Sequence, residues 1–315
     1  MEPFRSIAPS LLEMLLIVAI APLVTGLIQK MKARLQCRAG ASVFQPYRDL
    51  TKQLRKGRVV ADHTGGLFAA IPVLVMAATV SAAALVPVVW ASSVPGLPLG
   101  DAILLLALLS LARFLTVVGA LDAGGAFSGM GASREMTVGA LVEPVLMLVV
   151  FSVAIASGTT DLSDLVSRRA ALAPLSWRAS DLLALFAMMV LLLAETGRIP
   201  VDNPDTHLEL TMLHEGMLLE HSGPGLALML LATHTKQLIA ISLVAALFAP
   251  VGLADRAELG QLLIAVVAFA AKVLALALYL ALVESSYAKL RFFRVPQFLE
   301  IGFVSAFAAL ALRIL

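Results

Sequence analysis

Three consecutive stretches decide the fold: "LLALFAMMVLLLA" at residues 182–194, "ETGRIPVDNPDTHLELTMLHEGMLLEHSG" at 195–223 and "LALMLLATHTKQLIAISLVAALFA" at 226–249. The middle stretch carries six carboxylates and three histidines, in a chain of which only 14% of residues are charged. Runs as apolar as the two flanking stretches would expose large hydrophobic patches in water. The alternation therefore predicts two membrane-spanning helices joined by an acidic loop outside the bilayer.

The rest of the chain repeats this pattern. Its 315 residues are 60% hydrophobic, with a mean hydropathy of +0.95. A spanning helix needs ~20 mostly apolar residues. We therefore predict a single all-α integral membrane domain over residues 1–315, in which the shortest run, the fifth, could also be a buried or re-entrant helix. The eight predicted spans lie at roughly 10–28, 66–90, 99–121, 136–156, 178–195, 226–249, 259–284 and 298–314.

Lysine and arginine are unevenly divided between the two sides that this topology defines. Loops after odd-numbered spans carry 14 of the 23 basic residues, the opposite side with both termini carries six, and three lie within spans. Positively charged loops stay in the cytoplasm. We therefore expect large cytoplasmic loops at 29–65 and 196–225, and both termini on the non-cytoplasmic side.

The sequence predicts no redox centre and no metal site in this chain. Cys37 is the single cysteine, whereas an iron–sulfur cluster is usually held by four thiolates. His207, His214 and His221 are seven residues apart, which on a helix is ~10 Å between neighbours. Zinc ligands lie ~2 Å from the metal, so one ion cannot bridge that spacing. The alternative interpretation of the spacing is a solvated amphipathic surface helix.

Two other loops carry weaker signals. In "RLQCRAGASVFQPYRDLTKQLRKGRVV" at 34–60, Pro46 suits the first turn of a helix. Tyr47, Leu50 and Leu54 would share one face of that helix among basic residues. It could lie on anionic headgroups or dock a partner protein. The glycines of "DAGGAFSGMGASRE" at 122–135 would permit tight turns.

Several ionisable residues fall inside predicted spans, where a charge is costly and usually faces a bundle interior or a water path. Of these, Glu143, Lys236 and Lys272 lie deep within their spans, and Glu195, Glu284 and Arg113 lie toward the predicted cytoplasmic ends. Structural ion pairing and proton conduction need the same residue types, so both interpretations stay open.

The polar motifs resemble those of one family, the subunit shared by respiratory complex I (its subunit 1, or H) and energy-converting membrane-bound NiFe hydrogenases. The resemblance spans the full length and rests on three matches. They are "RLQCRAGASVFQPYRDLTKQLRKG", "GASRE" with Glu143, and "ETGRIPVD" followed by Glu209 and Glu220. It implies eight spans with long cytoplasmic loops after the odd-numbered ones.

Differences between the acidic loop and the complex I version of the family indicate which branch of the family the chain resembles. The complex I version typically reads Arg-x-Pro-Phe-Asp-Leu, whereas this chain has Val201 in place of Phe and continues with Asn203 and Pro204. This wording resembles the hydrogenase-4 component C type, found beside formate hydrogenlyase-like complexes. The changes argue against quinone binding, because this loop lines part of the quinone chamber in the family.

The resemblance implies a membrane-anchor and energy-coupling subunit that is not itself catalytic, in a cell's inner membrane. It would dock a soluble redox arm and link electron transfer to proton or cation translocation. The implied partners are hydrogenase large and small subunits carrying the NiFe centre and iron–sulfur clusters, together with antiporter-like membrane subunits and the lipid bilayer; no nucleic acid is expected. The alternatives are the quinone-chamber subunit of a complex I-like enzyme and a stand-alone ion transporter.

The residues that would line the docking loop and its chamber are Glu195, Arg198, Asp202, Asp205, Glu209, Glu215, Glu220, Gln45, Arg48, Asp49, Arg134 and Glu135. The residues that would form the proton path are Glu143, Glu195, Lys236, Lys272, Glu284 and Arg113.

The predicted topology can be tested with accessibility tags. A tag at either terminus should react with an impermeant reagent added outside intact cells, whereas a tag inserted after Lys56 should react only in inverted vesicles. The opposite pattern would overturn both the orientation and the cytoplasmic placement of the acidic loop.

Overall fold

The computed structural model describes residues 2–61, 64–90, 100–171, 177–202, 213–254 and 258–315. The described residues form helices and no strand, which confirms the predicted all-α class. The elements are α1 (Glu2–Leu35), α2 (Gln45–Leu54), α3 (Gly66–Ala83), α4 (Ala102–Asp122), α5 (Ala126–Ser157), α6 (Leu162–Ala171), α7 (Ala179–Glu195), α8 (His214–Leu218), α9 (Gly223–Phe248), α10 (Leu259–Ser286), the short 3-10 helix η3 (Phe292–Arg294) and α11 (Val295–Ile314).

A helix occupies the place of each predicted span. Within the described part of the chain, seven of them are long and apolar enough to cross a membrane: α1, α3, α4, α5, α9, α10 and α11. The predicted fifth span is α7, whose 17 residues measure about 26 Å at 1.5 Å per residue. That length is at the lower limit for crossing a hydrocarbon core of ~30 Å.

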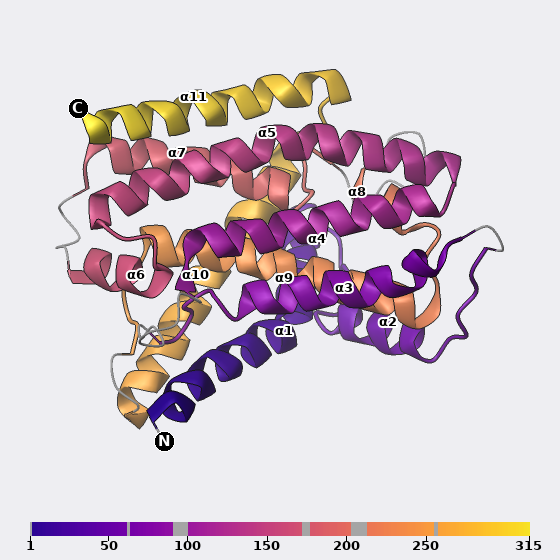
Figure 1. Ribbon diagram of the computed structural model, residues 1–315, viewed down its shortest axis with the longest axis horizontal. Helices are drawn as coiled ribbons and strands as arrows, with labels where there is room; N and C mark the ends of the chain where they lie inside the picture. Colours follow the sequence, from indigo (N-terminus) through magenta and orange to yellow (C-terminus); the bar gives the residue numbers. More distant parts are fainter. Residues whose placement is uncertain (1, 62–63, 91–99, 172–176, 203–212, 255–257) are drawn as a thin grey trace.

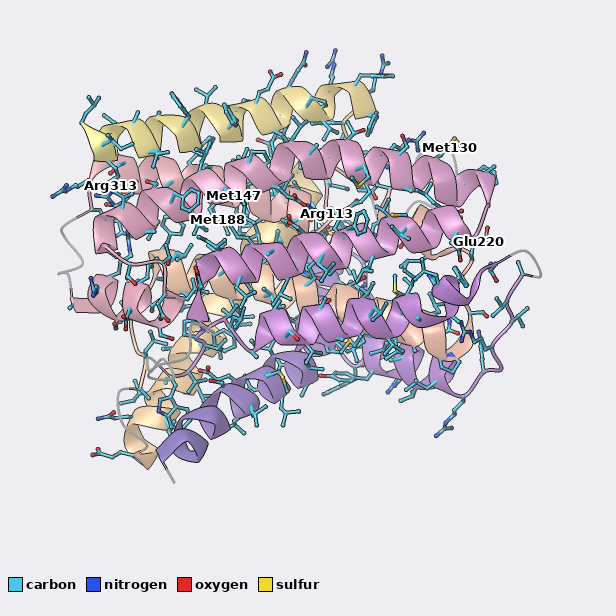
Figure 2. All side chains as sticks on the ribbon, in the orientation of Figure 1. Arg113, Met130, Met147, Met188, Glu220 and Arg313 are labelled. Atoms are coloured by element: carbon cyan, nitrogen blue, oxygen red, sulfur yellow. The ribbon has the colours of Figure 1, made fainter. Side chains whose placement is uncertain are left out.

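The long helices run side by side, and the two chain termini lie at the same end of the bundle (Figure 1). The short helices α2 and α8 lie at the opposite end, while α10 and the N-terminal half of α1 tilt away from the other helices. Figure 2 shows Arg313 at the end that holds the termini, Glu220 at the other end and Arg113 between them. The fold thus places the acidic loop's helix α8 at the same end as the basic helix α2.

Several boundaries differ from those that the sequence predicted. The second span was expected to reach residue 90, but α3 ends at Ala83. The amides of Val88, Val89 and Trp90 donate instead to one carboxylate oxygen of Glu13 in α1, at 3.2, 2.8 and 2.7 Å. In a longer helix these amides would donate to carbonyls four residues earlier. The Glu13 carboxylate is their acceptor instead, so the helix can end at Ala83.

The prediction that residues 122–135 form a glycine-rich loop was wrong, because α5 begins at Ala126. Gly131 lies inside this helix, and a Cβ there would come within 2.9 Å of the Leu213 carbonyl oxygen. Glycine at this position therefore allows α5 to pack closely against the backbone that leads into α8.

At the end that holds the termini, the structure contains a helix and a polar contact, neither of which the sequence predicted. Helix α6 buries Leu162, Leu165 and Val166 completely. Asp181 of α7 accepts from Arg169 of α6 at 2.9 Å and from Arg313 of α11 at 2.5 Å. One carboxylate therefore ties three helices together at this end.

Close packing between α1 and the loop before α2 predicts a severe effect of a small substitution. A Cβ at Gly26 would lie 2.0 Å from the Val43 carbonyl oxygen, whereas a Cβ at Gly129 in α5 would meet nothing within 4 Å. Gly26→Ala should therefore destabilise the chain by about 1–3 kcal/mol or more. Gly129→Ala should be neutral or stabilising by up to about 1 kcal/mol. Thermal stability of the purified, fluorescently tagged variants in detergent measures both, and equal stabilities would contradict the packing argument.

Candidate functional site

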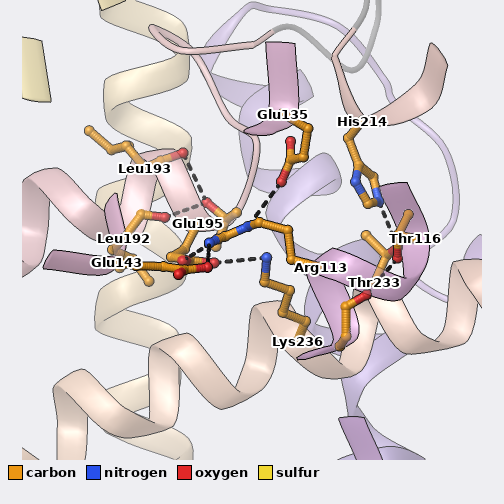
Figure 3. Close-up of polar contacts among 12 residues, drawn as sticks. Arg113, Thr116, Glu135, Glu143, Leu192, Leu193, Glu195, His214, Thr233 and Lys236 are labelled. Atoms are coloured by element: carbon orange, nitrogen blue, oxygen red, sulfur yellow. Dashed lines mark hydrogen bonds and ion pairs between the residues drawn. The ribbon is translucent and has the colours of Figure 1, made fainter. Parts of the chain in front are cut away.

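Arg113 of α4 lies at the centre of a buried charge cluster. Its guanidinium nitrogens contact Glu135 at 3.3 Å and Glu143 at 2.7 Å, both on α5, and Glu195 at 2.5 Å, at the end of α7 (Figure 3). Lys236 of α9 binds the second oxygen of Glu195 at 2.8 Å. We call these five residues the Arg113 cluster; they join four helices and contain two cations and three carboxylates.

A second charge cluster surrounds Glu284 of α10. Its carboxylate accepts from Arg198 at 3.2 and 3.4 Å and lies 3.4 Å from Nζ of Lys32 in α1. Arg198 also donates to the side-chain oxygen of Gln237 at 3.2 Å, and Thr25 donates to the same oxygen at 3.1 Å. We call these five residues the Glu284 cluster.

The two clusters adjoin along the chain. Lys236 and Gln237 are consecutive in α9, and each belongs to a different cluster. A chamber of about 280 Å³ extends from both clusters to the exposed Asp49 of α2. Its wall is formed by Thr25, Gln29, Lys32, Pro46, Asp49, Leu50, Glu135, Ala194, Glu195, Thr196, Gly197, Arg198, Asp202, His214, Glu215, Leu218, Leu230, Thr233, His234, Lys236 and Gln237. Most wall residues have polar side chains, although apolar atoms form the larger part of its surface, so the chamber can hold water beside the charged groups.

The structure brings together most of the predicted acidic-loop residues that it describes. Asp202 accepts from Lys289 at 2.8 Å and from the amide of Leu213 at 3.3 Å. Glu215 joins Asp202 in the chamber wall, whereas Glu220 lies outside it, against Gly125. Asp205 and Glu209 lie outside the described residues, as does His207.

The predicted residues of the first and third loops divide between the chamber and the surface. Gln45 donates to Asp49 at 2.8 Å within α2, and Asp49 lines the chamber. Arg48 is exposed on the same helix. Arg134 of α5 lies over the ring of Phe292, 5.8 Å from its centre, so it does not line the chamber.

The face predicted for the first-loop helix is only partly buried. Helix α2 has proline in its first turn, as predicted, and it buries Pro46 and Leu50. Leu54 was expected on the same apolar face but is 55% exposed at the end of the helix. The basic side of α2 remains open to a partner or to headgroups.

Lys272 lies apart from the other predicted path residues. Its Nζ donates to the carbonyl of Val251 at 2.6 Å, in the connection between α9 and α10. Twelve residues of α10 separate it from Glu284, about 18 Å along the helix axis. The structure thus places Lys272 apart from Glu284, and its part in the proton path stays a prediction.

The described histidines have separate environments. His214 begins α8 and its Nε2 lies 2.9 Å from Oγ1 of Thr233 in α9. His221 is buried and stacks on Phe68 with ring centres 4.4 Å apart. Among the described residues there is no group of three or more histidine, cysteine, aspartate or glutamate side chains that could hold a metal ion.

Three members of the Glu284 cluster, Lys32, Gln237 and Thr25, were not predicted from the sequence. Lys32 belonged to a predicted loop, but α1 continues to Leu35 and carries Lys32 into the bundle. Gln237 is uncharged and so was passed over in favour of its neighbour Lys236. The polar run "THTKQ" at 233–237, inside an otherwise apolar helix, was the available signal.

Fold and site define a multi-pass helical membrane protein whose charges are buried in pairs between helices. The family model described as NADH dehydrogenase matches residues 9–314, and the chain belongs to this family, which includes the H-type membrane subunit of complex I. The predicted family is thereby confirmed.

Two relatives from Escherichia coli (strain K12) match almost the whole chain. Formate hydrogenlyase subunit 4 is 36% identical over 96% of this chain and 97% of its own length. Hydrogenase-4 component C is 35% identical over 96% and 93%. The H-type NADH-quinone oxidoreductase subunit of Anaplasma phagocytophilum (strain HZ) is 28% identical over 70% and 69%. The chain is thus a subunit of the type found in multi-subunit membrane complexes.

The fold itself matches a chain in the structure of the membrane-bound sulfane sulfur reductase, an archaeal respiratory membrane complex. The TM-score is 0.81 and the match covers 99% of this chain and 100% of that chain, at 19% identity. This likeness establishes the shared arrangement of helices.

Burial of His221 makes stability depend on pH. Removal from water, with Arg58 nearby, lowers the pKa of His221 from 6.5 to about 4. Since the unfolded chain binds this proton more readily, the wild type should lose on the order of 2 kcal/mol from this group between pH 7 and pH 5. His221→Phe, which can keep the stack on Phe68, should lose less over that range. Thermal unfolding of both proteins at several pH values measures the difference, and parallel pH profiles would refute it.

Proposed function

We propose that this chain is the membrane subunit of an energy-converting NiFe hydrogenase of the hydrogenase-4 or formate hydrogenlyase type. It docks the soluble redox arm and couples electron transfer to translocation of protons or cations across a cytoplasmic membrane. The identities of 36% and 35% over 96% of the chain favour this branch over NADH-quinone oxidoreductase, whose matching subunit is 28% identical over 70%.

The observation that carries the coupling role is the position of the Arg113 cluster at the inner side of the polar chamber. Glu135, Glu195 and Lys236 belong to both the cluster and the chamber wall. Charges act on one another strongly where little water screens them. A change of charge in the docked redox arm would therefore be felt by the Arg113 cluster.

Glu143 is the member of the Arg113 cluster that faces outward. Its side chain is 38% exposed, although it lies in the middle of the long apolar helix α5. A charge at that depth facing lipid is costly. The exposed side of Glu143 supports contact with a neighbouring membrane subunit, to which the cluster would pass its protons.

The redox groups in this proposal belong to the partners. The large and small hydrogenase subunits would hold the NiFe centre and the iron–sulfur clusters, next to the cytoplasmic loops of this chain. The exposed basic residues of α2, beside the acidic residues of the chamber mouth, offer charges of both signs to that docked arm. Electrons would stay in the arm, and this chain would move only protons or cations.

A quinone-reducing complex is the second candidate, supported by the relatives from NADH-quinone oxidoreductases. The two candidates differ in measurable content. The purified complex should contain stoichiometric nickel and evolve or consume hydrogen, and it should not reduce an added quinone. A nickel-free complex with quinone reductase activity would contradict the first candidate function and support the second.

The coupling role predicts the phenotype of Glu143→Gln. Glutamine keeps the shape and hydrogen-bonding capacity of Glu143 but cannot titrate, so the assembled complex should lose ion translocation by about tenfold or more. Metal content should not change. Acidification or alkalinisation of sealed vesicles, normalised to turnover, measures the loss.

Glu258→Gln provides the matched control, because Glu258 is exposed in the connection before α10 and outside both clusters. It should translocate like the wild type. Normal coupling in an assembled Glu143→Gln complex would reduce Glu143 to a structural ion-pair partner.

A further inference from the structure

The hydrogen bonds around His214 favour one position for the proton of its neutral ring. The Thr233 hydroxyl donates to the Met229 carbonyl at 2.9 Å, one turn earlier in α9. A hydroxyl has a single proton. If that proton goes to the Met229 carbonyl, Thr233 accepts at its 2.9 Å contact with Nε2 of His214. This pairing places the proton of the neutral ring on Nε2 and leaves Nδ1 as an acceptor.

His214 also lies between two cavities. It belongs to the wall of the 280 Å³ chamber and to the wall of a cavity of about 30 Å³ behind it. The small cavity is also lined by Arg113, Glu135 and Lys236. It has room for about two water molecules, with polar partners of the number that a buried water needs.

Figure 3 shows the His214 ring between Thr233 and Glu135, with the nitrogen bonded to Thr233 on the side away from Glu135. The free nitrogen is therefore the one on the side of the Arg113 cluster.

The charged groups around His214 nearly balance. Glu135 and Asp202 favour a positive ring, while Lys236 and Arg113 oppose it. Burial acts most strongly and lowers the pKa of His214 below its ordinary value of 6.5. The ring is thus neutral at neutral pH, with its acceptor nitrogen available, and a change of charge in the chamber can protonate it briefly.

We propose that His214 passes protons between the chamber and the Arg113 cluster, which deepens the proposed function and rests on it. A hydronium ion in the chamber gives a proton to Nδ1, forming the imidazolium and leaving a neutral water, while Nε2–H stays hydrogen-bonded to Thr233. The Nδ1 proton then passes through a water of the small cavity to the carboxylate of Glu135, which becomes a neutral carboxylic acid. The ring returns to its neutral form, and only N–H and O–H bonds are made and broken.

The test uses the assembled complex in sealed vesicles. In His214→Gln the side-chain amide can donate to Thr233 but cannot become protonated near neutral pH, so translocation should fall about tenfold while turnover with an uncoupler stays near the wild-type rate. Thr233→Ser keeps the hydroxyl and should behave as the wild type. Thr233→Val removes the acceptor at nearly constant volume and should lower translocation. His221→Gln changes a buried histidine outside both cavities and should leave translocation unchanged at pH 7.5.

A spectroscopic measurement separates proton transfer from a structural role. Redox-induced infrared difference spectra of the complex with isotope-labelled histidine should contain an imidazole protonation band, which His214→Gln abolishes and His221→Gln keeps.

Translocation at the wild-type rate in the His214→Gln complex, without such a band in the wild type, would overturn this inference and leave the proposed function standing. A wild-type complex that translocates nothing would overturn both. If His214→Gln does not assemble, equal translocation in Thr233→Val and Thr233→Ser would refute the inference.

Discussion

The structure depends on the need to neutralise Arg113 inside an apolar bundle. A buried cation stripped of one partner costs several kcal/mol, so its carboxylates must be held in place by the helices that carry them. Glu135, Glu143 and Glu195 meet this requirement from α5 and α7. Gly139 supplies the space, since a Cβ there would lie 2.9 Å from the Arg113 side chain. The register of α4 against α5 is therefore fixed by charge as much as by apolar packing.

The Glu284 cluster extends the same constraint to α1 and α10. It joins α1 to α10 through Lys32 and uses Arg198, just beyond α7, as its second cation. Because Lys236 and Gln237 are neighbours, a movement of α9 alters both clusters at once. The two clusters and the chamber between them are thus linked through α9, as the proposed coupling role requires.

Sequence reasoning predicted the helices well and the side-chain partners less well, for a physical reason. Hydropathy marks each span within the chain itself, so the acidic loop, the helix at Pro46 and the ionisable residues in the spans could be located. Partner choice depends on rotation and tilt, which the average apolarity of a span does not encode. Lys272 was therefore predicted as a member of the proton path but its amine contacts the Val251 carbonyl, while Lys32 and Gln237 were missed.

The chamber and the Arg113 cluster end at Glu143, and this affects where the transmembrane voltage falls. Beyond Glu143, toward the end that holds the termini, α5 and α7 bury Val149, Val153, Ala187 and Leu191. If water fills the chamber as far as Lys236, the transmembrane voltage falls mainly across this apolar half, where moving one charge through 100 mV costs about 2.3 kcal/mol. In the proposed function, a proton that arrives at Glu143 would then have crossed little of the voltage. The voltage-dependent work would be left to the step that carries charge onward through a neighbouring subunit.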